Sequence, residues 1–457
     1  MRRNRSWLVQ ILFGALLSSF LVAFAVANPL KVGVFSVDAS PPVGSPLAYD
    51  LAMEVTVPLS CSGIVLLGDD QPVVLCAVDW IGIGNEGQEF FRQSIAEAVG
   101  TDPGRVALHT LHQHDAPRCD FTVDRLLNPF GINDQFFDSD WARTVIERTA
   151  QAVREAVNGA RPVTHLGTGL ARVEKIASNR RILGEDGKVA AMRWTACDDP
   201  ELRAKPAGLI DPNLRMISFW NGEDEVAALT YYATHPQSYY RTGGANPDFP
   251  GLARNEQQER TGIPHIHFTG ASGNIGAGKW NDGEPANRAI LADRLRSAME
   301  EAWKRTVKVP VEAVDLSWDS FRISLPAAPD LDREGLQARL NDSSASAEER
   351  LSAAGSLAWL ERTERGDETE VSCLKLGPSR ILHMPGELFV EYQLAAQEMR
   401  RDLFVAMAAY GDYAPGYIGT KIAYQEGGYE TRPGVSLVAP DVEAVLTAAI
   451  RRLLDLP

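Results

Sequence analysis

The chain has 457 residues, of which 45% are hydrophobic and 23% charged, so it can form a sizeable core in one large or two ordinary domains. Its formal net charge is −15, and lysine and arginine form no clustered run beyond the first residues, which argues against nucleic acid as a partner. Its five cysteines lie far apart without a Cys-x-x-Cys pair, a pattern that predicts neither a thiolate zinc site nor a dense disulfide framework, although one bridge would suit an oxidising compartment.

The N-terminus has the pattern of a secretory signal. Arg2, Arg3 and Arg5 precede an uncharged apolar run at 7–26, and Ala25-Val26-Ala27 supplies the small residues of a cleavage site. We expect 1–27 to be a signal peptide and 28–457 to be exported to the periplasm or the extracellular space. A retained membrane anchor is the alternative, because the apolar run approaches spanning length.

Apolar runs and turn signals in the first third of the chain predict strands alternating with helices. Gly68-Asp69-Asp70-Gln71 separates two apolar runs and is typical of a hairpin. A loop rich in proline and glycine at 39–46 is of the kind that often shapes the rim of a site. The expected strands are 30–37, 63–67 and 73–81, and the expected helices are 85–99 and 140–157.

The segment 106–117 is expected to be a buried strand that runs into a cluster of imidazoles. Side chains two apart on a strand share a face, so His112 and His114 would point into one pocket while His109 faces the opposite side. Imidazole is the commonest protein ligand for zinc, and a catalytic zinc needs about three protein ligands with one open position. Two histidines are too few to hold a catalytic zinc by themselves. The alternative to a zinc site is a pair of histidines that form ordinary hydrogen bonds at the end of a strand.

Two further strand ends carry polar residues. The segment 163–173 is expected to be a strand that leads into Ser178-Asn179-Arg180-Arg181, which is either a solvated loop or part of a site. A hairpin of 214–220 and 226–233 ends at Thr234-His235-Pro236. Because ligand residues tend to lie where strands pass into loops, His235 is a candidate third imidazole.

A glycine-rich loop, 270–279, follows the strand expected at 263–269. Its glycines could bring backbone N–H groups close to an oxyanion or a phosphate. The spacing is not that of a Walker A loop, because Lys279 is followed by Trp280. Ser272 lies in this loop, where a serine between small residues is more often part of a turn than a nucleophile.

The last third continues the alternation, with no evident internal repeat. The charged segment 326–366 is expected to be a helical insertion or cover. A strand at 380–384 stops at Pro385-Gly386-Glu387, where Glu387 would open a helix and could simply complement its dipole. Another strand, 404–409, precedes a tyrosine-rich loop. The pattern predicts an α/β fold with a mixed β-sheet core flanked by helices.

These strand-end stretches, taken in order, resemble the N-terminal catalytic domain of the neutral/alkaline non-lysosomal ceramidases, which are zinc-dependent amidases. The resemblance covers nearly all of 28–457. The matching stretches are Leu111-His112-Gln113-His114-Asp115-Ala116-Pro117, Asn179-Arg180-Arg181, His235-Pro236-Gln237-Ser238, Gly270-Ala271-Ser272-Gly273-Asn274, Pro385-Gly386-Glu387 and the loop from Tyr413 to Thr420.

The resemblance implies a set of site residues. The zinc would be held by His112, His235, Glu387 and a tyrosine, for which Tyr417 is the first choice and Tyr413 the alternative. It further implies His114 and Arg180 near the scissile carbonyl and Ser272 at the position of the family's serine. The chain departs from the family in a shorter 270–274 loop, in Asp115 after the histidine pair, and in the absence of room for a C-terminal immunoglobulin-like domain.

We therefore expect an exported zinc-dependent hydrolase of an amide-type bond, with ceramide or another N-acyl lipid as the first substrate and with possible peripheral membrane contact. The alternative is a non-hydrolytic zinc-containing relative that binds a polar ligand such as a glycan. An apolar groove beside the zinc would favour the lipid, and a shallow polar cleft would favour the alternative. The oligomeric state stays open.

Overall fold

The computed structural model describes residues 29–457, so the signal peptide predicted at 1–27 lies outside the described residues. Among the helices of 29–457, none combines the length and the apolar character needed to cross a membrane.

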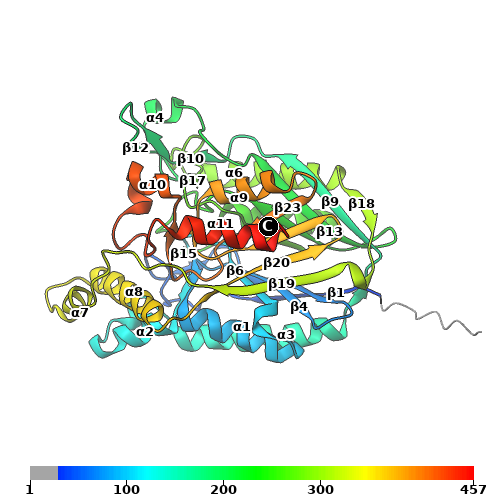
Figure 1. The fold of residues 1–457 in the computed structure, drawn as a ribbon, viewed down its shortest axis with the longest axis horizontal. Helices are drawn as coiled ribbons and strands as arrows, with labels where there is room; N and C mark the ends of the chain where they lie inside the picture. The colour runs from blue at the N-terminus through cyan, green and yellow to red at the C-terminus, as the bar shows by residue number, and fades with distance from the viewer. Residues whose placement is uncertain (1–28) are drawn as a thin grey trace, which may run out of the picture.

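The first of three large sheets is built from the first third of the chain (Figure 1). Strands β1, β3 and β4 are antiparallel neighbours, and β6 joins parallel to β4 after helix α1 (Asn85–Val99). Helix α3 (Ser139–Asn158) follows, and Asp138 caps it by accepting a hydrogen bond from the backbone N–H of Trp141. The order across the sheet is β6 (Val106–Thr110), β4 (Val73–Val78), β3 (Ser60–Leu67), β1 (Lys31–Asp38) and β8 (Arg161–Pro162).

The second sheet has the same organisation. Strands β9, β13 and β14 are antiparallel neighbours, β16 joins parallel to β14 after helix α5 (Asp248–Thr261), and helix α6 (Ala286–Lys304) follows. The order across the sheet is β16 (His265–Thr269), β14 (Asp224–Tyr232), β13 (Asn213–Asn221), β9 (His165–Arg172) and β18 (Val307–Pro310).

The third sheet repeats the arrangement once more. Here β23 joins parallel to β21 after helix α9 (Val390–Met399), and helix α11 (Val442–Leu453) follows. No repeat is evident in the sequence, because the repeat lies in the order and direction of the elements and not in residue identities. The order across the sheet is β19 (Leu316–Ile323), β20 (Thr369–Leu376), β21 (Ser379–His383) and β23 (Phe404–Ala408).

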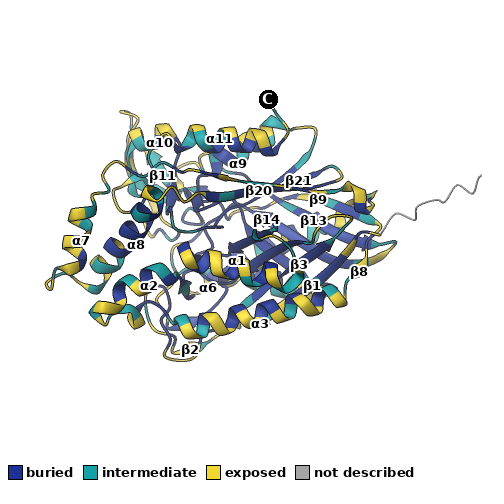
Figure 2. Ribbon diagram, turned by 60° about the horizontal axis from the view of Figure 1, so that its bottom comes forward, coloured by how far each residue is buried: buried dark blue, intermediate teal, exposed yellow. Residues whose placement is uncertain are grey.

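The three sheets share one central apolar core, and each has helices on its other face. On β4, Leu75 points into the central core while Val74 and Cys76 point towards α1 and α3, as the two-residue period of a strand requires. In the same way α5 and α6 cover the second sheet, and α9 and α11 cover the third. The helices bury one face and expose the other (Figure 2). The predicted α/β fold with helices flanking a mixed-sheet core is confirmed.

A group of helices lies beside this body. Helices α7 (Arg333–Asn341) and α8 (Ala347–Glu364) fall between β19 and β20, and α8 begins with a capping box between Ser346 and Glu349. They share buried apolar residues with α2 (Phe121–Leu127) and the loop after it, among them Phe136 and Leu357. These helices are found within the segment 326–366.

Short elements connect the larger ones. They are β2 (Glu54–Val55), β5 (Gly82–Ile83), β7 (Arg118–Cys119), β10 (Ser178–Asn179), β11 (Arg181–Leu183), β12 (Val189–Met192), β15 (Gly244–Ala245), β17 (Ile275–Gly276), β22 (Glu387–Leu388), β24 (Tyr417–Ile418), α4 (Pro200–Ala204), α10 (Lys421–Glu426) and the 3-10 helices η1 (Pro103–Arg105), η2 (Asn128–Phe130), η3 (Asn133–Gln135), η4 (Ala313–Asp315) and η5 (Tyr429–Thr431).

Candidate metal centre and active site

In each of the three sheets, a segment that follows one strand of the parallel pair contributes to one place. His112 and His114 follow β6, His235 follows β14, and Glu387 lies in β22, after β21. All these strands belong to the parallel pair of their sheet, and ligand sites in α/β folds form at the carboxyl ends of such strands. Glu387 does not open a helix as expected from the sequence, because α9 begins at Val390.

The way in which His112 and His114 come together differs from the prediction. Strand β6 ends at Thr110, so the two histidines do not alternate along one strand. The backbone of His112 has a φ of +71°, a conformation that non-glycine residues adopt rarely. Its N–H donates to the carbonyl of Trp80 at 2.9 Å, which holds the turn. His109, still on β6, lies elsewhere, with Nδ1 2.8 Å from the carbonyl oxygen of Ala409.

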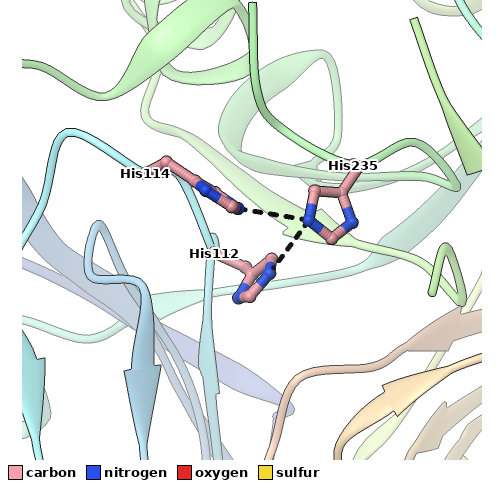
Figure 3. A group of neighbouring side chains, drawn as sticks. All are labelled: His112, His114 and His235. Carbon is pink, nitrogen blue, oxygen red and sulfur yellow. Dashed lines mark hydrogen bonds between the residues drawn. The ribbon is translucent and has the colours of Figure 1, made fainter. Parts of the chain in front are cut away.

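Three imidazoles converge in the buried site (Figure 3). Nε2 of His235 lies 3.2 Å from Nε2 of His112 and 3.2 Å from Nε2 of His114. Nδ1 of His112 lies 2.6 Å from the carbonyl oxygen of Ile81 and donates to it, so Nε2 of the neutral ring carries a lone pair. Burial lowers the pKa of His114 and of His235 well below the ordinary imidazole value, and the neighbouring His112 lowers both further. The rings of His114 and His235 are therefore neutral, and each has a lone pair on one of its two nitrogens.

Glu387 completes the cluster with a carboxylate. Its Oε2 lies 3.3 Å from Nε2 of His112 and 3.9 Å from Nε2 of His235, and no hydrogen-bond donor reaches this buried oxygen. Two acceptors that face each other without a proton between them repel, and a cation between them removes the repulsion. Imidazole nitrogens with a carboxylate oxygen form a donor set that suits zinc, so these residues fit a metal of this kind.

Three tyrosines from the loop after β23 hold different parts of the site. The hydroxyl of Tyr413 donates to Oε1 of Glu387 at 2.9 Å. The hydroxyl of Tyr417 accepts a hydrogen bond from Nη2 of Arg180 at 3.3 Å. Tyr410 stacks on His112 with ring centroids 4.4 Å apart. Burial raises the pKa of all three phenols. Tyr413 thus touches a predicted ligand and Tyr417 touches a predicted substrate-binding residue, and the choice between them as metal ligand stays a prediction.

Arg180 is buried rather than solvated. Its Nη2 donates to the carbonyl of Gly273 at 2.6 Å and forms an ion pair with Oε1 of Glu430 at 3.0 Å. Burial alone would lower the pKa of Arg180, but the acidic groups of Tyr417 and Glu430 raise it above its ordinary value. Glu430 is fully buried and was missed by sequence reasoning, because a single glutamate in a loop carries no distinguishing signal.

Ser272 reaches the histidines through a tyrosine. Its Oγ lies 2.8 Å from the hydroxyl of Tyr410, and that hydroxyl lies 3.4 Å from Nδ1 of His235. The serine is fully buried. The structure thus connects Ser272 to the histidine cluster by a chain of hydrogen-bonding groups.

The glycine-rich loop does not form the expected cradle for an oxyanion or a phosphate. The N–H groups of Gly270 and Gly273 already donate to the carbonyls of Tyr232 and Leu388. A Cβ at Gly273 would lie 2.2 Å from the carbonyl oxygen of Glu387. Here glycine therefore permits close packing of two backbone segments beneath the site, and not contact with a ligand.

A cavity of about 970 Å³ adjoins the cluster. Ligand pockets for small molecules commonly have this size. His112, His114 and Glu387 line it together with side chains of the α2 and α8 helices and of the loops around them. Its apolar lining includes Leu47, Leu51, Val123, Phe136, Phe137, Leu351, Val435 and Leu437, and its polar lining includes Tyr49, Asp50, Arg118, Asp120, Asp134, Arg241, Glu348, Tyr413 and Tyr417.

Aromatic residues beside His114 were not singled out from the sequence. The ring of Tyr49 stacks on His114 with centroids 5.4 Å apart, and the ring of Tyr240 meets it edge-on at the same centroid distance. Tyr49 belongs to the loop after β1 and Tyr240 to the loop after β14. The composition of both loops, rich in glycine, proline and aromatic residues, was the available signal.

Comparison with known proteins gives a structural match. No family model matches the chain, and no curated protein sequence does. The crystal structure of neutral ceramidase from Pseudomonas aeruginosa matches with a TM-score of 0.66 and 16% identity over 94% of this chain and 75% of that one. A ceramidase complexed with C2 matches with a TM-score of 0.67 and 15% identity over 94% and 76% of the two chains. The chain therefore folds as a neutral-ceramidase-like domain.

Proposed function

We propose that this protein is a zinc-dependent hydrolase that cleaves the amide bond of an N-acyl lipid. The observation that carries the proposal is the buried convergence of three imidazole nitrogens with an unpartnered carboxylate oxygen beside a large cavity. The fold shared with two ceramidase structures supports the reaction class.

The zinc would be held by His112, His235, Glu387 and Tyr417, with Tyr413 as the alternative tyrosine. Zinc in such a site acts as a Lewis acid and lowers the pKa of bound water. Ile81 fixes the tautomer of His112 through its carbonyl, a contact that directs Nε2 to the metal position.

His114 is the residue best placed to move a proton. Its Nε2 faces His235, and its buried Nδ1 has no hydrogen-bond partner. Tyr49 stacks on the ring and keeps it in place. A neutral imidazole with one free nitrogen can accept a proton from an attacking group or donate one to the leaving amine.

Arg180 and Ser272 would act on the scissile carbonyl. The guanidinium of Arg180 is fixed by Glu430 and reaches the hydroxyl of Tyr417, so it adds positive charge where negative charge develops in an acyl-transfer reaction. Ser272 would supply a hydroxyl through its contact with Tyr410.

The apolar lining of the cavity favours an acyl chain over a glycan as the bound group. Phe136, Phe137 and Leu351 line the cavity together with His114. Fully burying one such side chain against an acyl chain contributes roughly 1.5–3 kcal/mol. Export of the protein and contact with a membrane surface, from which an N-acyl lipid would be drawn, form part of the same proposal.

Metal analysis of the purified protein, combined with hydrolysis assays on ceramide and simpler N-acyl amines, tests the function. We expect one zinc per chain and hydrolysis that is lost on chelation and restored by zinc. A protein that binds zinc stoichiometrically but cleaves none of these amides would refute the hydrolase, and a protein without bound metal would refute the site.

A further inference from the structure

Arg241 is a cationic residue at the cavity whose charged group is not paired with a protein carboxylate. It lines the same cavity as His112 and His114, and it is exposed. Within residues 29–457 its guanidinium forms no ion pair, and its hydrogen bond is made by the backbone N–H alone. The guanidinium N–H groups are therefore free to bind a ligand.

Two other arginines near the site are already paired with carboxylates. Arg180 pairs with Glu430, and Arg288 pairs with Asp115 and lies 3.3 Å from Asp248. Arg118 also lines the cavity without an ion pair, but its guanidinium donates to the carbonyl of Ala48. Arg241 differs from it, because within residues 29–457 its guanidinium donates to no protein acceptor.

Two aromatic rings lie between the guanidinium of Arg241 and His114. The Cζ atom of Arg241 lies 5.5 Å from the ring centroid of Tyr49 and 5.5 Å from that of Tyr240. The same two rings contact His114, each with a centroid distance of 5.4 Å. Arg241 is thus one ring contact removed from an imidazole of the proposed active site.

The backbone of Arg241 is held in a strained conformation by a buried group. Its φ of +65° is unfavourable for a residue with a Cβ. Its N–H donates to Oδ1 of Asp115 at 3.0 Å, and Asp115 directly follows His114. A strained backbone conformation persists only where contacts with the surrounding structure hold it, and such positions are common at binding sites.

We propose that Arg241 binds a carboxylate on the amine portion of the substrate, so that the preferred substrates are N-acyl amino acids and related anionic N-acyl conjugates. This inference rests on the proposed amidase function. It adds a substrate class, since the cavity would take the acyl chain along its apolar lining and the anionic group at Arg241. A guanidinium binds carboxylate through two parallel hydrogen bonds, which gives geometric as well as charge selectivity.

The test compares two amides that share an acyl chain, N-lauroylglycine and N-lauroylethanolamine, with wild-type protein, R241Q, R241K and the control R452Q. Arg452 is also exposed and stacked on one ring, with Cζ 3.8 Å from the centroid of Phe321, but it lies on α11, outside the cavity. For R241Q we expect kcat/KM to fall roughly tenfold to a hundredfold on the glycine conjugate and less than about threefold on the ethanolamide. R241K should recover part of the loss, and R452Q should match wild type.

Equal losses on both amides in R241Q would show a structural role and overturn the proposal, as would unchanged rates on the glycine conjugate. If wild-type protein cleaves neither amide, calorimetric binding of the same two compounds decides. Tighter binding of N-lauroylglycine that R241Q abolishes would keep the anion site while the hydrolase function fails. Equal affinity of wild-type protein for both compounds would overturn the anion site itself.

Discussion

The substitution Glu387→Gln tests the metal centre through two effects of opposite sign. In the metal-free protein, Oε2 of Glu387 and the lone pair of His112 Nε2 face each other at 3.3 Å without a donor. A glutamine amide is nearly isosteric and places a donor there. A buried acceptor without a partner costs about 1–3 kcal/mol, so the metal-free variant should gain stability of that order.

Metal binding should change in the opposite direction. The substitution removes the negative charge from the ligand set, and loss of a supporting residue outside the ligand shell already costs 10–100-fold in metal affinity. We expect zinc to bind at least about a hundredfold more weakly, which corresponds to about 2.7 kcal/mol.

The assay compares urea unfolding of chelator-treated protein with zinc titration, each at a pH where imidazole is neutral. Glu348→Gln is the matched control, because it removes the same charge from a carboxylate that lines the cavity on α8, outside the histidine cluster. A glutamine variant that is less stable without metal and binds zinc as tightly as wild type would refute the assignment of Glu387 as a ligand.

Three other substitutions probe neighbouring parts of the site. His235→Ala should lose most bound zinc by mass spectrometry while His165→Ala, on β9, keeps it, and equal zinc content would mean that the site is misplaced. Ser272→Ala should slow hydrolysis by roughly a hundredfold with zinc retained, and wild-type rates would exclude a serine-dependent mechanism. Asp79→Ala should cost about 3–5 kcal/mol of unfolding free energy, because it leaves Arg254 buried without the carboxylate it contacts at 2.7 and 2.9 Å; a loss below about 1 kcal/mol would contradict the buried pair.

The sequence indicated several of the residues that converge but not the backbone geometry that brings them together. Strand ends carrying His112, His235 and Glu387 could be found, because apolar runs that stop at polar residues are visible without an alignment. The positive φ of His112 could not be found, since it depends on the backbone carbonyl of Trp80, a contact between distant segments. The prediction that His112 and His114 share a pocket because they lie two residues apart on one strand was therefore right about the proximity and wrong about its cause.

Residues that shape the cavity were harder to predict than those at its centre. Tyr49 and Arg241 lie in loops with no regular period, and their meeting depends on β15 pairing with β2, a contact of two residues on each strand. For the glycine-rich loop, the sequence predicted a role in ligand binding that the structure does not show. Its glycines suggested ligand contact, whereas Gly273 packs against the backbone of Glu387.

The threefold use of one strand order explains why the site forms where it does. Each sheet contributes a loop from the same end of its parallel strand pair, and the three loops bring His112, His235 and Glu387 to one point. A metal bound there would join all three sheets, so its binding energy would stabilise the whole body and not a single loop. At a free zinc concentration a thousand times the dissociation constant, that stabilisation is about 4 kcal/mol. This is a large part of the unfolding free energy of a typical folded domain, which is about 5–15 kcal/mol. Without metal, the repulsion between the unpaired acceptors destabilises the fold at the same point. The metal centre is therefore expected to control how firmly the three sheets hold together as well as the chemistry in the cavity.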